Sequence, residues 1–305
     1  MSNDSAAACK GVQFGIAMTP ADYAIQPPVL AQAVEERGFE SLFFPEHTHI
    51  PVARLTPLSA ALAPELAHLM PKEQELPNEY RHAHDPFVAL TAAACVTRRI
   101  KLGTGVCLVV ERDPIVLAKE VASLDVLSGG RVVLGVGGGW NAEEMANHGV
   151  VNYKRRFRLL REKVLAMKAI WTAEQAEFHG ELINFEPIWS WPKPVQPGGP
   201  PILMGGESRR NYARVVEYCD GWIPHLLPGL DLASCIRELR ETAERANRSF
   251  DSISLSAFRV DADESAVQRL IRAGFHRIVF GIRADTPNVI LPWLDRCAQI
   301  AAKFQ

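Results

Sequence analysis

The sequence lacks the features that mark membrane, nucleic-acid-binding and disulfide-stabilised proteins. No uninterrupted apolar run approaches the roughly 20 residues that a membrane-spanning helix needs, and the six cysteines contain no C-x-x-C pair. The 33 Lys and Arg residues are nearly balanced by 35 Asp and Glu residues, so the net charge of -2 provides no basic surface for a phosphate backbone. We therefore expect a cytoplasmic protein with reduced, buried cysteines that acts on a small molecule and binds neither membranes nor nucleic acids.

The sequence does contain a regular alternation of short strand-like and longer helix-like segments. Residues 153–171 show the helical pattern most clearly, because Leu160, Val164 and Met167 recur at steps of three and four. Such alternation is typical of parallel strands joined by crossover helices, and eight repeats favour an α/β fold, the (β/α)8 TIM barrel, with residues 1–305 as a single domain. An open, doubly wound sheet is the alternative. The predicted strands are residues 12–18, 41–44, 100–110, 131–136, 201–204, 221–224, 253–260 and 277–282.

Glycines occupy matching places in these repeats. Gly38 and Gly274 each follow a predicted helix and precede an aromatic residue and a strand, and Gly221 stands in a looser copy of the same junction. A positive φ costs glycine little at the end of a helix. Two segments, residues 48–84 and 172–200, exceed what a minimal barrel requires, and we interpret them as insertions at the mouth, after the second strand and before the fifth.

The active site of such a barrel lies at the C-terminal ends of the strands. The segment after the second predicted strand carries Glu46, His47 and His49 there. Imidazole titrates near neutral pH, so His47 is a candidate for acid/base chemistry or coenzyme contact. A metal cluster is disfavoured because no third ligand stands at a recognisable spacing. A histidine with a structural role is the remaining alternative.

The segment after the fourth predicted strand is rich in glycine. Its order, Gly-Val-Gly-Gly-Gly-Trp-Asn over residues 135–141, lacks the G-x-G-x-x-G spacing of a dinucleotide-binding fold. We expect Gly137 and Gly138 to let a flat ring or a phosphate approach the backbone, with Trp140 and Asn141 adding stacking and hydrogen bonds. A tight β-to-α turn without any ligand would use the same glycines.

The end of the fifth predicted strand has the form of a phosphate site. Gly205, Gly206 and Ser208 end this strand and open a helix. Free N–H groups and the positive end of the helix dipole suit such a junction to phosphate. The equal alternative is that Ser208 only caps the helix.

Taken together, these motifs resemble a known family. The order of motifs in the F420-dependent branch of the luciferase-like monooxygenase superfamily is matched by Glu46-His47, residues 102–106 (Leu-Gly-Thr-Gly-Val), residues 128–131 (Ser-Gly-Gly-Arg), residues 135–141, Lys193-Pro194, Gly205-Gly206 and residues 220–222 (Asp-Gly-Trp). The resemblance implies an oxidoreductase that moves a hydride between the deazaflavin coenzyme F420 and an organic substrate, and it implies a homodimer. An FMN-dependent monooxygenase and a non-catalytic flavin- or deazaflavin-binding protein are the alternatives.

The resemblance also implies roles for individual residues. It places a non-prolyl cis peptide bond between Gly105 and Val106, next to Thr104, in a bulge of the third strand behind the coenzyme ring. It places His47 near the reactive ring edge, with Glu46 beside it. The other residues that it assigns to the coenzyme are Gly137, Gly138, Trp140 and Asn141 along the ring, and Gly205, Gly206 and Ser208 at the phosphate. It assigns no residue to a metal.

One position departs from the sugar-phosphate dehydrogenases of that branch. These enzymes are similar in carrying an acidic catalytic residue directly after the glycines of the fourth strand, where this chain has Trp140. The difference argues against a phosphorylated sugar and against a two-residue acid/base mechanism of their kind. His47 is then the candidate for proton transfer.

Overall fold

Eight parallel strands form a closed barrel in the computed structural model, which describes residues 11–61, 75–226 and 230–305. Around the barrel the strands follow the order β1-β10-β9-β8-β7-β4-β3-β2, so each strand pairs with its neighbours in sequence once the β5–β6 hairpin is set aside. The predicted (β/α)8 barrel is confirmed. The barrel strands are β1 (Gln13–Met18), β2 (Ser41–Phe44), β3 (Lys101–Cys107), β4 (Val132–Val136), β7 (Ile202–Gly205), β8 (Gly221–Ile223), β9 (Ser254–Val260) and β10 (Arg277–Ile282).

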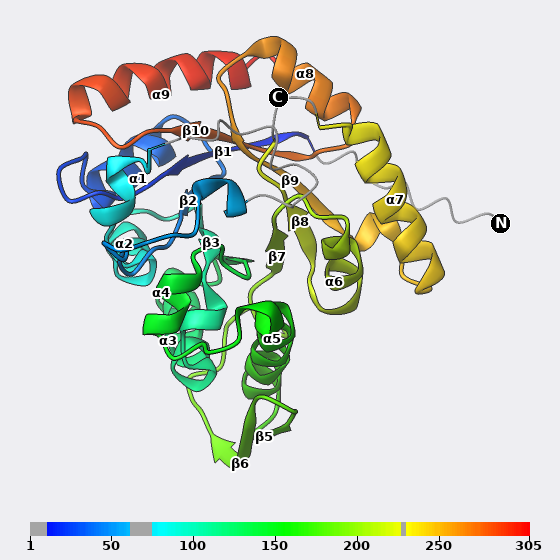
Figure 1. Cartoon of the computed structure of the whole chain (residues 1–305). Coiled ribbons are helices and arrows are strands. Elements are labelled where there is room, and N and C mark those ends of the chain that lie inside the picture. Colours follow the sequence, from blue (N-terminus) through cyan, green and yellow to red (C-terminus); the bar gives the residue numbers. More distant parts are fainter. Residues whose placement is uncertain (1–10, 62–74, 227–229) are drawn as a thin grey trace.

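The helices surround the barrel (Figure 1). Apolar side chains pack between the strands and the helices, and a second, smaller apolar cluster fills the inside of the barrel. Within the barrel, Phe43, Leu203, Phe258 and Val279 belong to a compact inner cluster against which Val106 packs. The described helices are α1 (Pro27–Glu36), α2 (Pro86–Val96), α3 (Pro114–Ser128), α4 (Ala142–Asn147), α5 (Arg156–Thr172), α6 (Arg210–Tyr218), α7 (Leu232–Arg245), α8 (Glu264–Arg272) and α9 (Pro287–Ala301), with short 3-10 turns η1 (Leu58–Ala61), η3 (Asn78–Arg81), η4 (Val109–Glu111), η5 (Tyr153–Arg155) and η6 (Phe250–Ser252).

The third strand ends earlier than the sequence predicts. It was expected to continue to Val110, but β3 stops at Cys107 and the chain turns into η4. The cause lies in Glu46, whose Oε2 accepts a hydrogen bond of 2.7 Å from the backbone N–H of Leu108. An N–H group used in this way is not available to a strand ladder.

The glycines of the repeated junctions divide into two kinds. Gly38 (φ +77) and Gly274 (φ +94) adopt the left-handed conformation that was predicted for them. Gly221 is not among the residues of positive φ, and it begins β8 instead. A Cβ at Gly221 would lie 2.5 Å from the carbonyl oxygen of Ser254, so this glycine allows two strands to approach closely.

The two insertions differ in position. The described part of the segment after β2 lies at the mouth of the barrel, where the N–H of Thr56 donates to Glu143 of α4 over 3.1 Å; residues 62–74 of this segment are outside the described residues. The segment before β7 forms the antiparallel hairpin of β5 (Gln175–His179) and β6 (Asn184–Trp189). The prediction that this segment lies at the mouth of the barrel was wrong. The hairpin lies along the outer side of α5 (Figure 1), where Glu162 accepts a hydrogen bond of 2.6 Å from Leu182 N.

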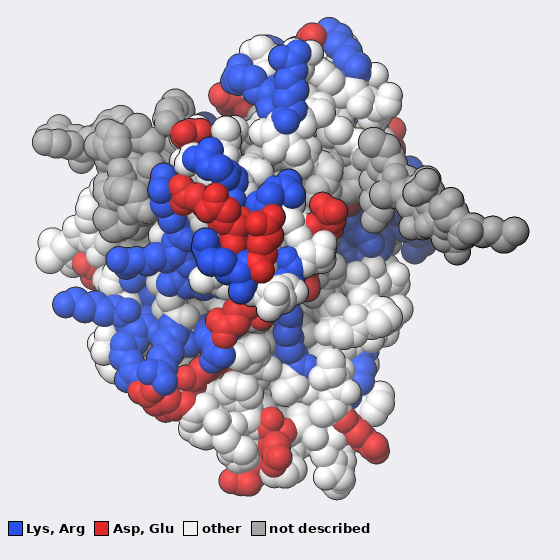
Figure 2. All heavy atoms as spheres, turned by 90° about the vertical axis from the view of Figure 1, so that its right-hand side faces the viewer, with Lys and Arg blue, Asp and Glu red and all other residues white. Residues whose placement is uncertain are grey.

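The surface agrees with the balanced composition. On the face drawn in Figure 2, basic and acidic side chains lie close to one another. The five cysteines in the described ranges are unpaired, and all but Cys95 are buried; Cys95 faces solvent from α2, where an apolar run in the sequence suggested burial. Within those ranges, no helix combines the length and the apolar character needed to cross a membrane.

Candidate active site

The imidazole of His47 lies just beyond the C-terminal end of β2 and is held on three sides. Its Nδ1 is 2.7 Å from Oε2 of Glu144, its ring stacks on Tyr80 with 4.9 Å between centroids, and Trp140 meets it edge to face at 5.7 Å. Only 11% of the side chain is exposed. When Nδ1 donates to the carboxylate, Nε2 is the atom left to exchange a proton with a substrate.

A cavity of about 40 Å³ lies beside this imidazole. Its walls are formed by Thr19, Pro45, Glu46, His47, Tyr80 and Ala83. The buried hydroxyl of Thr19 has no hydrogen-bond partner in the described residues. A larger hollow of about 440 Å³ lies at the opposite end of the barrel, around residues 196–201 and Asp220. We take the smaller cavity as the candidate active site, since barrels of this type carry their chemistry at the C-terminal ends of the strands.

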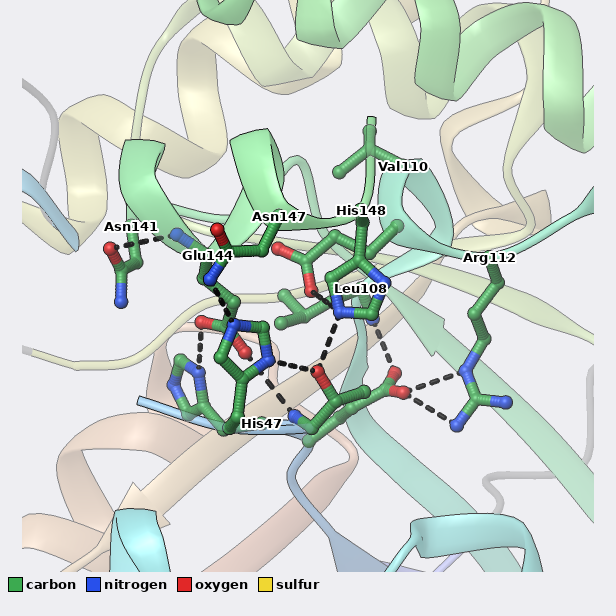
Figure 3. Close-up of polar contacts among 12 residues, drawn as sticks. His47, Leu108, Val110, Arg112, Asn141, Glu144, Asn147 and His148 are labelled. Carbon is green, nitrogen blue, oxygen red and sulfur yellow. Dashed lines mark hydrogen bonds and ion pairs between the residues drawn. The ribbon is translucent and has the colours of Figure 1, made fainter. Parts of the chain in front are cut away.

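Glu144 is one of the residues near this site that sequence reasoning missed. It lies in the first turn of α4 and is fully buried, and its Oε1 accepts a hydrogen bond of 3.2 Å from Thr48 N. Asn141 caps the helix, because its Oδ1 accepts a hydrogen bond of 3.3 Å from Glu144 N (Figure 3). An N-cap followed by acidic residues in the first turn was a signal in the sequence. The pairing with His47, which is 97 residues away, needed the fold.

Glu46 was expected to contact a coenzyme, and its carboxylate is bonded within the protein. Oε2 accepts the N–H of Leu108 at 2.7 Å, and Oε1 accepts Nε of Arg112 at 2.6 Å. Only 1% of the side chain is exposed. Arg112 also binds Asp85 and Glu120, so one guanidinium joins three carboxylates. In the described residues, Glu46 therefore fixes the loop that follows β3.

The third strand contains the bulge that the family resemblance implied. The peptide bond between Gly105 and Val106 is cis, which confirms the prediction for this position. The register with β4 shifts between Thr104 and Cys107. Thr104 Oγ1 donates a hydrogen bond of 2.7 Å to the carbonyl of Gly135, so the start of the bulge is fastened to the neighbouring strand.

Two of the glycines assigned to the coenzyme face this bulge, Gly137 from just beyond β4 and Gly205 from the end of β7. A Cβ at Gly137 would lie 2.6 Å from Cγ2 of Val106, and a Cβ at Gly205 would lie 2.6 Å from Cγ1 of the same residue. Real Cβ atoms do not approach so closely. Glycine at both positions therefore makes room for the side chain of Val106 at the mouth of the barrel. Val106 also forms one wall of any space that remains there for a ligand.

The loop after β4 packs against α5 and the insertion. A Cβ at Gly138 would lie 2.8 Å from the ring of Phe157. Trp140 is 8% exposed, its ring contacts His47, and the guanidinium of Arg54 lies 5.4 Å from the ring centroid. The indole is therefore a wall of the site and offers little free face for stacking.

The junction of β7 and α6 retains the properties of an anion site. Gly206 has φ +91 and its carbonyl accepts a hydrogen bond of 2.9 Å from Trp222 Nε1. Helix α6 has no side-chain hydrogen bond at its N-cap, Arg209, and Ser208 Oγ accepts only a long bond of 3.4 Å from Arg210 N. The N–H groups of Asn211 and Tyr212 already donate to the carbonyls of Ser208 (2.8 Å) and Arg209 (3.2 Å), so in this first turn only the weakly bonded N–H of Arg210 remains for an anion.

Two titratable groups lie beside this junction. Glu207 is buried, its Oε1 accepts a hydrogen bond of 2.8 Å from His225 N, and burial raises its pKa to about 7. Part of the His225 side chain is exposed to solvent. Packing among the strand ends still removes hydration from its imidazole, and this loss, followed by the charge of Arg259, lowers its pKa to about 4. Near neutral pH, this part of the mouth carries a neutral imidazole and a partly protonated carboxyl group.

The second histidine of the β2 segment does not join the first. Nδ1 of His49 is 2.9 Å from Thr48 Oγ1, and its Nε2 is 2.8 Å from Asn147 Nδ2. Both nitrogens of His49 thus have partners other than His47. Throughout the part of the chain that the structure describes, no three His, Cys, Asp or Glu side chains are grouped so as to hold a metal ion.

The closed barrel of alternating strands and helices, with a buried histidine–carboxylate pair at its strand ends, has the architecture of a (β/α)8-barrel enzyme. The profile of the luciferase-like monooxygenase family matches residues 26–288, and the chain belongs to that family. Its relatives include F420-dependent dehydrogenases and reductases, and the protein is an oxidoreductase.

Individual comparisons agree with this assignment. An uncharacterized protein of Mycobacterium tuberculosis is 36% identical over 289 residues, which are 94% of this chain and 98% of the relative. The F420-dependent glucose-6-phosphate dehydrogenase of Kineococcus radiotolerans is 33% identical over 200 residues, 64% of this chain and 58% of that enzyme. The solved structure of the F420-dependent tetrahydromethanopterin reductase of Methanopyrus kandleri superposes with a TM-score of 0.74 at 18% identity, covering 97% of this chain and all of that one, and so shares the fold.

Proposed function

We propose that this oxidoreductase uses coenzyme F420 to exchange a hydride with a small organic molecule, and that His47 transfers the accompanying proton. The observation that carries the proposal is the geometry of His47, whose Nδ1 is fixed by Glu144 over 2.7 Å while Nε2 is left for a substrate. The names of two relatives, one a dehydrogenase and one a reductase, support F420 as the coenzyme.

The residues at the mouth fit a bound coenzyme in three respects. Asn141 Nδ2 and Thr19 Oγ1 are buried and have no hydrogen-bond partner in the described residues, so each can donate to a ring carbonyl or nitrogen. The bulge at Val106 offers an apolar surface. The positive end of the α6 dipole at Ser208, next to the Gly205-Gly206 turn, suits a phosphate.

The protein's part in the reaction follows from these contacts. When bound, the deazaflavin supplies the hydride donor or acceptor carbon. His47 gives a proton to the substrate oxygen or takes one from it at Nε2, while Glu144 holds the ring in one orientation. Trp140 and Tyr80 cover the imidazole and exclude water from two of its sides. Glu46 acts at a distance by fixing the loop after β3.

The test compares coenzymes and then substrates. Purified protein is titrated with F420 and with FMN, and the bound F420 is then mixed with a panel of alcohols, aldehydes, ketones and activated alkenes while its absorbance is followed. Tighter binding of F420 and a change of its redox state on one substrate class support the proposal. His47→Asn should abolish turnover while leaving F420 binding within a few-fold of that of the native protein.

The family name itself favours a second candidate, an FMN-dependent monooxygenase. That candidate predicts tighter binding of FMN and oxygen consumption with reduced FMN. Tight F420 binding without turnover on the whole panel, in native protein and His47→Asn alike, would instead identify a deazaflavin-binding protein without catalysis.

A further inference from the structure

A second buried carboxyl group lies within electrostatic range of Glu144, and the proposed function does not use it. Glu111 ends η4, only 1% of its side chain is exposed, and neither of its oxygens has a hydrogen-bond partner in the described residues. An ionised carboxylate without hydrogen bonds costs several kcal/mol when buried. The geometry therefore favours the neutral acid.

The electrostatic surroundings of Glu111 also favour its protonated, neutral form. Burial, followed by repulsion from Glu144 and Glu46, raises its pKa to about 9. The nearby cations oppose this effect but are bound elsewhere: Lys163 Nζ donates to the carbonyls of Val110 (2.8 Å) and Arg112 (2.6 Å). The charged and titratable groups facing Glu111 are Glu46 after β2, Arg112 after η4, Glu144 of α4, His148 at the end of α4, and Lys163 of α5.

His148 connects this carboxyl group to the solvent. Its Nε2 lies 3.8 Å from Oε2 of Glu111 and 2.6 Å from Thr48 Oγ1, and 27% of its side chain is exposed (Figure 3). Burial and the neighbouring His49 lower the pKa of His148, so its imidazole is neutral near neutral pH. A neutral imidazole can accept a proton from a carboxylic acid and release it to water.

We propose that Glu111 is a proton relay between the His47–Glu144 pair and the solvent, with His148 as its exit. The use of this relay rests on the proposed function. A neutral carboxylic acid suits the role, because it accepts a proton on its carbonyl oxygen and releases its own proton from the other oxygen.

The proton count balances along this path. A proton taken from a substrate binds Nε2 of His47, and the proton on Nδ1 passes to Glu144. Glu144 then passes one proton to Glu111 as Glu111 passes its own to His148, and His148 releases it to water. One proton enters and one leaves, and each carboxyl group returns to its starting state, while His47 is left with its proton on Nε2. When Nε2 next gives that proton to a substrate and a proton returns inward through Glu144 to Nδ1, the first tautomer is restored. In the reverse reaction the same steps run inward.

The first test needs neither coenzyme nor substrate. Infrared difference spectra of the apoprotein should show at pH 7 the C=O stretch of a buried carboxylic acid that is lost in Glu111→Gln. The same band should be retained in Glu186→Gln, a control on the exposed hairpin, and in Glu207→Gln, which removes the other partly protonated buried carboxyl group. In Glu144→Gln the band should disappear at a pH lower by about one unit or more, because a repelling charge is gone. The proposal is overturned if the band is absent at pH 7, or if the pH at which the band is half lost is the same in Glu144→Gln as in the native protein.

The second test follows the exit. When apoprotein is mixed with D2O, the Glu111 band shifts as its proton is exchanged. In His148→Asn this exchange should slow by about tenfold or more, while His179→Asn, on the exposed hairpin, should leave the rate unchanged. Equal rates in all three proteins would remove His148 from the path, and circular dichroism of each variant verifies that it is folded.

These outcomes are independent of the proposed function. If F420 binds and turns over but Glu111 is ionised at pH 7, the relay fails and the oxidoreductase proposal stands. If Glu111 and His148 behave as described but no substrate reacts, the proton path stands and the proposed reaction fails.

Discussion

Replacing Gly137 by alanine tests whether the strand-three bulge and the glycines around it form one packed unit. The new Cβ would lie 2.6 Å from Cγ2 of Val106, whereas ordinary contacts lie between 3.4 and 4 Å. Forcing a methyl group into a filled space of this kind costs about 1 to 3 kcal/mol. For a protein of this size, each kcal/mol lowers Tm by roughly 2 °C, so Gly137→Ala should lose about 2 to 6 °C.

The assay is thermal unfolding, with a matched control and a rescue. Gly11→Ala has no atom within 4 Å of the new Cβ and should leave Tm unchanged. Val106→Ala removes the methyl groups that collide, so the double variant should be more stable than the sum of the single effects allows, with a coupling of about 1 kcal/mol or more. Strictly additive effects, or an unchanged Tm in Gly137→Ala, would refute the packing described at the bulge.

Three further variants test the site. Glu144→Gln should lower kcat by about 10²-fold or more while F420 affinity changes little, since the carboxylate orients the proton-transfer residue; steady-state kinetics measure both. Glu46→Gln should lower the free energy of unfolding by about 3 kcal/mol in denaturant titrations, because Arg112 loses a buried partner. Glu207→Gln should gain stability relative to the native protein as pH rises from about 4.5 to 7 and no further, by at most about 3 kcal/mol. The sign follows because the native carboxyl keeps its proton up to about pH 7, whereas the unfolded chain releases it near its ordinary pKa; equal pH profiles of the two proteins would contradict it.

The barrel strands could be predicted because each one is a short apolar run buried on both faces, as in β2 and β4. The β5–β6 hairpin could not be predicted in the same way. Gln175–His179 alternates polar and apolar residues, but the run is only five residues long, most residues of the hairpin are exposed, and Pro187 interrupts β6, so the sequence carries no long buried run that marks a strand pair.

The candidate site was accessible in part. His47 could be found because it follows a strand directly, and the Gly105–Val106 bulge because a family motif marks it. Glu144 and Glu111 were missed for a physical reason. Glu144 matters because it bonds His47, which is 97 positions away, and Glu111 matters because it is buried without a hydrogen-bond partner in the described residues. Neither property can be predicted from the neighbouring sequence.

The most direct test of the central claim is to locate F420 on the protein by NMR, with labelled valine methyl groups, histidine rings and asparagine side-chain amides. On addition of F420, the account predicts shifts at the methyls of Val106, the ring of His47 and the amide of Asn141. Shifts confined to the opposite end of the barrel, around residues 196–201 and Asp220, would contradict it.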